Sequence, residues 1–395
     1  MFYQKIKNIL KNNFVIYLIY YYFISFILRI FGFFVKVDEN KILFVVYGGQ
    51  RFDDSPRVIY EHLKKQSSNF KYIWAFKDPE DFKKYLPNQE MVRIDSVSYF
   101  YHALSSRYWI TNSSASRGLN FLKKETKNMM FTHGMTGIKH TGSDINDETT
   151  QYNRNIYKER QDLVFLEGNS KEVNILAKAW DLPRKVFRNV GLPRNDELFK
   201  ISQEKIMSLR KKLNIPNGKK VILYAPTFRD YIKDEKNSVT LNPPINFEYW
   251  EKRLGSEYVL LFTAHYEIAN LIDIPKTDFV INAFKYPQIN DLLIVSDLII
   301  SDYSSVFFDF SLLEKPMFSF AFDFDEYSER RGLYDGYEQL FPDGVHRGEE
   351  SLITSILNMN YEDACRYTKE NVKYKYFEHF DPSVERCIKN IFEEL

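Results

Sequence analysis

The stretch LLIVSDLIISDYSSVFFDF at residues 292–310 joins a buried strand to the start of a helix. Its first apolar run ends near Ser301, two serines follow, and Val306 opens a second, bulky apolar segment. If the strand ends near Ser301, Ser304 can cap a helix that runs through Leu313. The free amides and positive dipole end of this helix, together with two hydroxyls, predict an anion site that needs no Walker loop.

Ordinary helix capping explains the same two serines without any ligand, and this alternative stays open. Within the helix we expect Val306, Phe310 and Leu313 to face the core. Asp309, in the second turn, either accepts a hydrogen bond from a sugar hydroxyl or braces the next loop. The turn therefore predicts a binding site only in combination with other motifs.

Apolar runs and amphipathic stretches alternate along the chain on both sides of this turn. This alternation is typical of β-α units around parallel sheets, and 395 residues exceed what one core usually supports. We therefore expect an α/β protein with domains at residues 37–200 and 218–380, joined by a linker at 201–217. Residues 1–36 form a separate apolar segment in front of them, and 381–395 form a further helix.

Polar side chains gather directly after four of the predicted strands. THG follows NMMF, TFRD follows VILYAP, AHY follows VLLFT, and SDYSS follows DLII. In open α/β sheets, ligands bind beyond the carboxyl ends of the strands. Four such ends carrying His, Arg, Thr, Ser and Asp predict a site between two facing domains.

The segment FTHGMTGIKH at 131–140 combines His133, Gly134, Lys139 and His140 after a strand. Glycine lets the backbone approach a ligand closely, and a neutral histidine can take a proton from an attacking hydroxyl. A loop histidine without a catalytic role is the alternative for His133, and more strongly for His140. The segment is a candidate for the acid–base part of the site.

Two further candidates follow strands in the second half of the chain. APTFRD carries Thr227 and Arg229, whose guanidinium can clamp a phosphate through two hydrogen bonds. A plain ion pair between Arg229 and Asp230 is the alternative. His265, in TAHYEIAN, either donates to a phosphate or supports the walls of the site.

Several classes of site are disfavoured. Neither G-x-G-x-x-G nor G-x-x-x-x-G-K-[ST] occurs, so we predict no dinucleotide site, no P-loop and no cofactor. Cys365 and Cys387 lie far apart, which indicates neither a disulfide framework nor zinc. We assign no metal to Asp323 and Asp325 or to the acidic segment 143–147, because helix-like sequence follows each. A formal net charge of +1 from 54 basic and 53 acidic residues argues against nucleic acid as a partner.

The N-terminal segment FVIYLIYYYFISFILRIFGFFV at 14–35 is apolar and aromatic, and Lys5, Lys7 and Lys11 precede it. Arg29 leaves an uninterrupted run of 15 residues, or about 22 Å of helix against about 30 Å of hydrocarbon. Bulky aromatics in place of small residues disfavour a cleaved secretory signal. We predict a helix that lies in the membrane interface rather than crossing; burial in a dimer or against the N-terminal domain is the alternative.

Seven blocks of the sequence together resemble the CDP-glycerol glycerophosphotransferase family, which builds teichoic acids and related capsule polymers. The likeness spans roughly residues 42–390. The blocks follow the family's order: FTHGMTGIK, VGLPRND, VILYAPTFRD, TAHYEIAN, YPQINDLLIVSDLIISDYSSVFFDFSLLEKP, DFDEYSERRGLYDGYE and HFDPSVERCIKNI. Their number and order make the resemblance specific.

The resemblance implies a GT-B-like fold of two facing Rossmann-like domains, with the nucleotide in the C-terminal domain and a polyprenyl-linked acceptor approaching between them. The family's two histidines carry over to His133 and His265. Its nucleotide-phosphate contacts carry over to Arg229 and the SDYSS turn, including Ser304 and Ser305. Together with the candidates from the residues themselves, we assign substrate binding to Gly134, Lys139, Thr227, Arg229, Asp302, Ser304, Ser305 and Asp309.

These assignments predict a transferase that moves glycerol phosphate from CDP-glycerol to a hydroxyl of a polyprenyl-diphosphate-linked saccharide and releases CMP. His133 acts as the general base and His265 donates to the transferred phosphate, although spacing alone does not separate the two roles. The alternatives among enzymes are transfer of ribitol phosphate or another CDP-alditol phosphate, and glycosyl transfer from a nucleotide sugar. The alternative outside enzymes is a non-catalytic membrane scaffold.

A CDP-activated donor is cytosolic, so the catalytic domains must face the cytosol. A crossing helix with its Lys-rich end inside would place them on the wrong side. We therefore expect a peripheral protein on the cytoplasmic face of the cell membrane, and a homo-oligomer is compatible with this arrangement.

Overall fold

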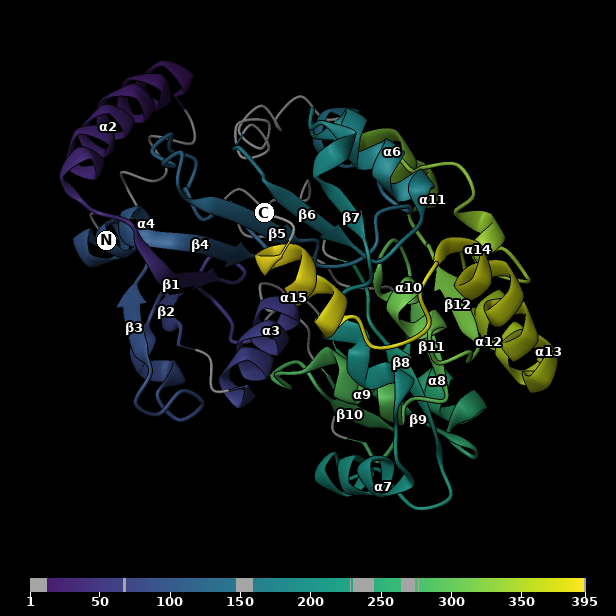
Figure 1. Ribbon diagram of the computed structural model, residues 1–395. Helices are drawn as coiled ribbons and strands as arrows, with labels where there is room; N and C mark the ends of the chain where they lie inside the picture. The colour runs from purple at the N-terminus through teal and green to yellow at the C-terminus, as the bar shows by residue number, and fades with distance from the viewer. Residues whose placement is uncertain are drawn as a thin grey trace.

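The computed structural model describes residues 13–66, 69–146, 159–227, 229, 245–263, 274–275 and 277–393. Their strands form two wholly parallel sheets with helices around them, as Figure 1 shows. The seven-stranded sheet has the order β3-β2-β1-β4-β5-β6-β7, and the six-stranded sheet has the order β10-β9-β8-β11-β12-β13. The α/β architecture with two parallel sheets agrees with the alternation in the sequence.

The N-terminal sheet consists of short, apolar strands that helices cover on both sides. Its strands are β1 (Asp38–Val45), β2 (Lys71–Phe76), β3 (Glu90–Arg93), β4 (Ser106–Thr111), β5 (Lys127–Phe131), β6 (Leu163–Leu166) and β7 (Phe187–Asn189). The helices of this half are α2 (Phe14–Phe34), α3 (Asp54–Lys65), α4 (Val97–Ser105) and α6 (Ser170–Ala179).

The C-terminal sheet repeats this construction. Its strands are β8 (Lys220–Tyr224), β9 (Tyr258–Phe262), β10 (Val280–Asn282), β11 (Leu298–Ser301), β12 (Met317–Phe320) and β13 (Val345–His346). Its helices are α8 (Phe247–Leu254), α9 (Ile289–Val295), α10 (Val306–Ser311), α11 (Phe324–Arg330), α12 (Glu349–Asn358), α13 (Tyr361–Tyr367) and α14 (Tyr374–Tyr376). Between the sheets run the 3-10 segment η5 (Pro193–Phe199) and α7 (Gln203–Lys212), and α15 (Val384–Phe392) ends the described chain.

In both sheets the chain starts at a central strand and works outward to one edge, then returns to the other side of that strand. The reversal lies between β1 and β4 in the N-terminal sheet and between β8 and β11 in the C-terminal sheet. Loops diverge at such a reversal, so the carboxyl ends of these strands offer room for ligands. The predicted turn at residues 302–305 follows β11 and therefore lies at a reversal.

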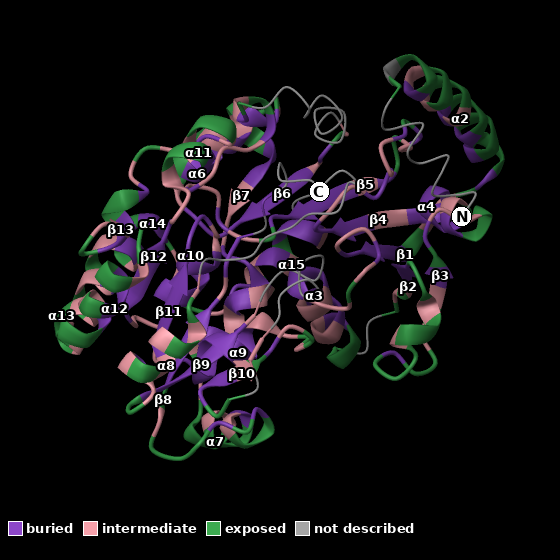
Figure 2. Ribbon diagram, turned by 180° about the vertical axis from the view of Figure 1, so that it is seen from behind, coloured by how far each residue is buried: buried purple, intermediate pink, exposed green. Residues whose placement is uncertain are grey.

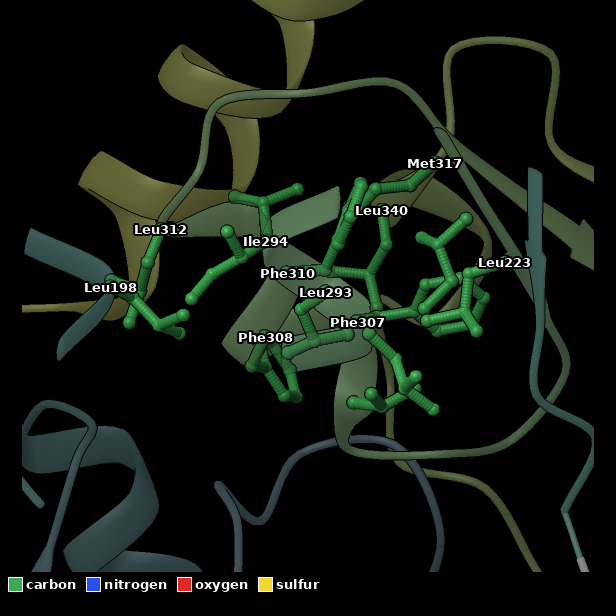
Figure 3. Close-up of a cluster of buried hydrophobic side chains, with 14 of the residues drawn as sticks. Leu198, Leu223, Leu293, Ile294, Phe307, Phe308, Phe310, Leu312, Met317 and Leu340 are labelled. Carbon is green, nitrogen blue, oxygen red and sulfur yellow. The ribbon is translucent and has the colours of Figure 1, made fainter. Parts of the chain in front are cut away.

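Helix α10 lies inside the C-terminal core. Phe307, Phe308 and Phe310 are fully buried, and Figure 3 shows them within a cluster that includes Leu293 and Leu340. The helix ends at Ser311, two residues earlier than the sequence predicted, because hydrogen-bonded turns replace the α-helical bonding pattern after this residue. Its burial on every side fixes the orientation of the turn that precedes it.

Helix α15 crosses back to the N-terminal domain, where it lies against α3 (Figure 1). Cys387 and Ile391 belong to the same buried cluster as Ile42 and Phe44 of β1. Asp196 of η5 binds the start of α15, because its carboxylate accepts from the backbone N–H groups of Ser383 and Val384. The last helix of the chain thus completes the first domain.

Helix α2 presents two different faces. One stripe packs on the N-terminal domain: the Ser25 hydroxyl accepts from the Asn120 N–H at 2.9 Å, and Gly32 lies against Leu104. The opposite face is exposed, as the green of most of α2 in Figure 2 shows, and its side chains are apolar. Its exposed large side chains are Val15, Ile16, Ile19, Tyr20, Tyr22, Phe23, Phe26, Ile27, Ile30, Phe31, Phe33 and Phe34.

Candidate active site

The histidine–glycine segment and the serine turn meet across the domain boundary. Gly134 has φ +142°, and a Cβ atom built on it would lie 2.3 Å from the Ser305 hydroxyl oxygen. Only glycine allows this backbone conformation and this close approach. His133 and Ser305, which are 172 residues apart in the sequence, therefore belong to segments that meet across the domain boundary.

The serine turn runs from β11 into α10. The Ser304 hydroxyl accepts from the Val306 N–H at 3.3 Å, but the N-cap position predicted for Ser304 is held by Ser305, which makes no side-chain cap bond. Ser304 and Ser305 are only partly buried, whereas Asp302 before them is buried. Within the described residues, these two hydroxyls are the groups of the turn that remain open to a ligand.

Arg229 holds the turn from behind. Its guanidinium is fully buried, donates to Asp302 Oδ2 at 2.8 Å and to both oxygens of Asp323, and lies over the Tyr303 ring at 4.9 Å. Asp302 Oδ1 in turn accepts from the Thr227 N–H at 2.7 Å. These buried ion pairs and hydrogen bonds orient the turn. The direct contact of Arg229, Asp302 and Thr227 with substrate stays a prediction.

The residues around His133 come from three elements of the N-terminal domain. The Tyr47 ring lies edge-on to the His133 ring at 6.0 Å between centroids. The Tyr47 hydroxyl donates to Asp54 Oδ2 at 2.7 Å, and the Asn112 amide donates to the same oxygen at 3.0 Å. Tyr47 and Asp54 both have positive φ angles, 46° and 65°, a strained conformation typical of functional sites.

The environment of His133 favours the neutral imidazole. Partial loss of solvation lowers the pKa of His133, although the residue as a whole is exposed. The Arg194 and Lys139 charges lower the pKa further, whereas Asp54 opposes them. A histidine with a pKa below its usual value near 6.5 is neutral at pH 7 and can accept a proton.

Arg194, which no motif assignment had singled out, joins both domains at this point. Its Nη1 donates to the His133 carbonyl oxygen at 2.8 Å and lies 3.6 Å from Asp54 Oδ2. Its Nη2 pairs with Asp309 Oδ2 of α10. The adjacent Asn195 amide donates to Asp309 Oδ1 at 2.8 Å. Asp309 therefore braces η5 and not the loop that follows α10, and its predicted contact with substrate stays a prediction.

A cavity of about 430 Å³ opens beside this network, between α3, η5 and the start of α9. Tyr47, Asp54 and Arg194 contribute to its wall, together with Gln288 and Asn290 of the C-terminal domain. Both domains thus line the space next to the His133 segment. The VGLPRND block contains Arg194 and Asn195, and it is the sequence signal that could have found these two residues.

The remaining candidates lie outside this contact region. Lys139 pairs through its backbone with Leu333, and the His140 ring lies 4.6 Å from the Tyr334 ring between centroids, so both join the loop to the C-terminal domain. His265 falls outside the described residues. No group of three or more His, Cys, Asp or Glu side chains suited to a metal occurs within the described ranges. Asp323 there is paired with Arg229.

Comparison with known proteins now identifies the family. A family model described as CDP-Glycerol:Poly(glycerophosphate) glycerophosphotransferase matches residues 27–393. The chain belongs to this family. The match confirms the family predicted from the seven sequence blocks, and with it a glycerophosphotransferase of teichoic acid biosynthesis.

Similar proteins cover nearly all of the chain. A teichoic acid poly(glycerol phosphate) polymerase of Staphylococcus epidermidis is 32% identical over 89% of this chain, which spans only 48% of that relative. A protein with the same description from Bacillus spizizenii is 29% identical to this chain. The match covers 94% of this chain and 95% of that relative.

A solved structure is similar along the same length. The wall teichoic acid polymerase TagF, as a histidine-to-asparagine variant soaked with CDPG, matches with a TM-score of 0.78 and 30% identity over 91% of this chain and 89% of that chain. This likeness confirms the predicted GT-B-like fold.

Proposed function

We propose that this glycerophosphotransferase moves glycerol phosphate from CDP-glycerol to a hydroxyl of a polyprenyl-diphosphate-linked saccharide and releases CMP. The observation that carries the proposal is the contact of the His133–Gly134 segment with Ser305 across the domain boundary. It supports the proposal because a histidine with a lowered pKa and two partly exposed hydroxyls belong to segments that meet, in a chain of this family. The CDPG-soaked relative supports the choice of donor.

In this reaction the acceptor oxygen forms a bond to the phosphorus that carries glycerol, and the bond from that phosphorus to the CMP oxygen breaks. His133 takes the proton of the acceptor hydroxyl, and CMP leaves with the bonding electron pair. Ser304 and Ser305 donate to the phosphate oxygens, and Arg229 holds Asp302 so that the turn keeps its shape. Phosphoryl transfer depends mainly on such alignment and charge stabilisation. His265 remains the predicted donor to the transferred phosphate.

The test is an assay of the purified protein with CDP-glycerol and a lipid-linked acceptor. Release of CMP is expected, whereas glycosyl transfer would release a nucleoside diphosphate. Substitution of CDP-ribitol for CDP-glycerol tests the other alditol donor. His133→Ala should reduce transfer about 10²- to 10⁴-fold, the usual contribution of a general base. Near-normal transfer by this variant would remove His133 from the role.

We further propose that α2 lies in the cytoplasmic membrane interface. Its length and composition suffice to cross a bilayer, but a stripe along the helix packs on the N-terminal domain. A crossing would draw that part of the domain into hydrocarbon, whereas a parallel orientation buries only the apolar outer face. Arg29 suits this arrangement because its Nε donates to the Asn120 carbonyl oxygen at 2.9 Å, on the protein side.

A further inference from the structure

A guanidinium ties the two domains together beside His133. Arg194 lies on η5, the segment that links the two sheets, and its side chain is 11% exposed. On the N-terminal side it contacts the His133 carbonyl oxygen and Asp54. On the C-terminal side it pairs with Asp309, whose side chain is 3% exposed.

The backbone around Arg194 is held from both domains as well. Its N–H donates to the Ser55 hydroxyl of α3 at 3.3 Å, and its carbonyl oxygen accepts from the Asn290 amide of α9 at 2.6 Å. Asn195 follows with its own bond to Asp309. The guanidinium has little freedom to move, so its two contacts hold a fixed relation between the His133 segment and α10.

We propose that Arg194 is a positioning residue for the transfer reaction: by holding the His133 carbonyl and the Asp309 carboxylate at once, it fixes the catalytic histidine opposite the Ser304–Ser305 turn. The inference rests on the proposed role of His133. A planar fork with several donors suits this task, whereas an ammonium group acts as a single point charge. The pair is also buried, so either partner alone would leave an uncompensated charge.

Arg194 also sets the charge around the imidazole. The described charged groups that act on His133 are Asp54 of α3, Arg194 of η5 and Lys139 of its own loop. Asp309 of α10 pairs with Arg194. Arg194 lowers the pKa of His133 and Asp54 raises it. Removal of the arginine charge leaves Asp54 less opposed, so the pKa of His133 should rise.

The first experiment is Arg194→Lys in the full-length protein with CDP-glycerol and a lipid-linked acceptor. The lysine keeps the charge but loses the fork, so kcat should fall about 10²-fold, the effect of a small misplacement of reacting groups. KM for CDP-glycerol should change little, because the donor contacts remain. An unchanged kcat, or a loss confined to KM, would contradict the proposal.

The second experiment is the charge-balanced double variant Arg194→Gln/Asp309→Asn, which carries the test if Arg194→Lys does not fold. The acid limb of the kcat/KM profile should move to higher pH, and NMR titration of His133 should show the same rise of its pKa. The control is Arg386→Ala, because Arg386 also ties segments near η5 but donates to the Val190 carbonyl and to Asp381. This control should leave the titration of His133 as in the wild type.

The two proposals fail in different ways. If His133→Ala retains transfer, the proposed function is wrong whatever Arg194 does. If His133→Ala abolishes transfer while both Arg194 variants keep the wild-type kcat and His133 titration, only the positioning role is wrong.

Discussion

At the scale of single residues, Gly134 and Ser305 leave no space for an added methyl group. Gly134→Ala would place Cβ 2.3 Å from the Ser305 hydroxyl oxygen and would strain a backbone with φ +142°. We expect kcat to fall at least about tenfold, since a displacement of an ångström can cost more. Gly344→Ala is a matched control, because Gly344 also has a positive φ, +69°, but no atom within 4 Å of the added Cβ. Equal losses of activity in both variants would contradict the steric explanation.

Glu167 is a buried carboxyl next to the Arg194 network. Its Oε2 accepts from the Leu192 N–H at 3.0 Å and the Asn195 amide at 3.2 Å. Burial and the nearby Asp309 raise the pKa of Glu167 to about 8. Above its usual pKa of about 4.3, the folded protein keeps a proton that the unfolded chain has lost, so this residue reduces stability as the pH rises toward 8.

Glu167→Gln should remove this dependence, because the amide oxygen can still accept both hydrogen bonds. Relative to the wild type, the variant should gain free energy of unfolding between pH 5 and pH 8, by at most about 1.4 kcal/mol per pH unit. Urea unfolding at several pH values measures this difference. Glu350→Gln, at an exposed position, controls for the loss of a carboxylate. A constant difference between Glu167→Gln and wild type would show that Glu167 is ionised throughout.

At the scale of elements, the exposed face of α2 should govern membrane binding. Phe23 and Phe26 are each 62% exposed, so Phe23→Ser/Phe26→Ser should leave the fold intact. Each buried phenylalanine contributes roughly 1.5–3 kcal/mol, so vesicle binding should weaken by about 10²-fold or more. Flotation with phosphatidylglycerol vesicles measures it. Met207→Ser, which alters a 62% exposed side chain on α7, should bind as the wild type does.

At the scale of the whole molecule, the end of the chain stabilises its beginning. Ile391 of α15 is fully buried in the N-terminal cluster, and Phe392 stacks on Phe70 at 4.9 Å between centroids. Ile391→Ala should lower the free energy of unfolding by about 2–5 kcal/mol, through lost burial and the cavity left behind. Hydrogen exchange should accelerate first in the N-terminal sheet, and Leu357→Ala, at a 41% exposed site, should cause neither effect. Faster exchange confined to the C-terminal sheet would contradict this packing.

Much of the architecture was predictable because local patterns specify it. Apolar runs of strand length, such as Lys71–Phe76 and Tyr258–Phe262, agree with β2 and β9. The strands β3 and β13 have no such run, because only one residue of each is buried.

The candidate site was predictable only in part. His133 and the serines stood out because polar residues directly after an apolar strand are unusual, and the structure brings these groups together. Arg194 and Asp54 did not stand out, because charged residues in loops are common in any sequence. Their burial and their partners arise only after both domains are assembled.

The order of residues along the chain was sufficient for the two parallel sheets, the family and the turn after β11, since strand periodicity, capping and motif order are local properties of the sequence. Tertiary structure alone determined that α15 completes the N-terminal core, that Arg229 faces inward on Asp302, and that Arg194 links His133 to Asp309. These contacts join residues far apart in sequence. Each depends on burial, which arises only when distant elements pack together and which no short segment encodes.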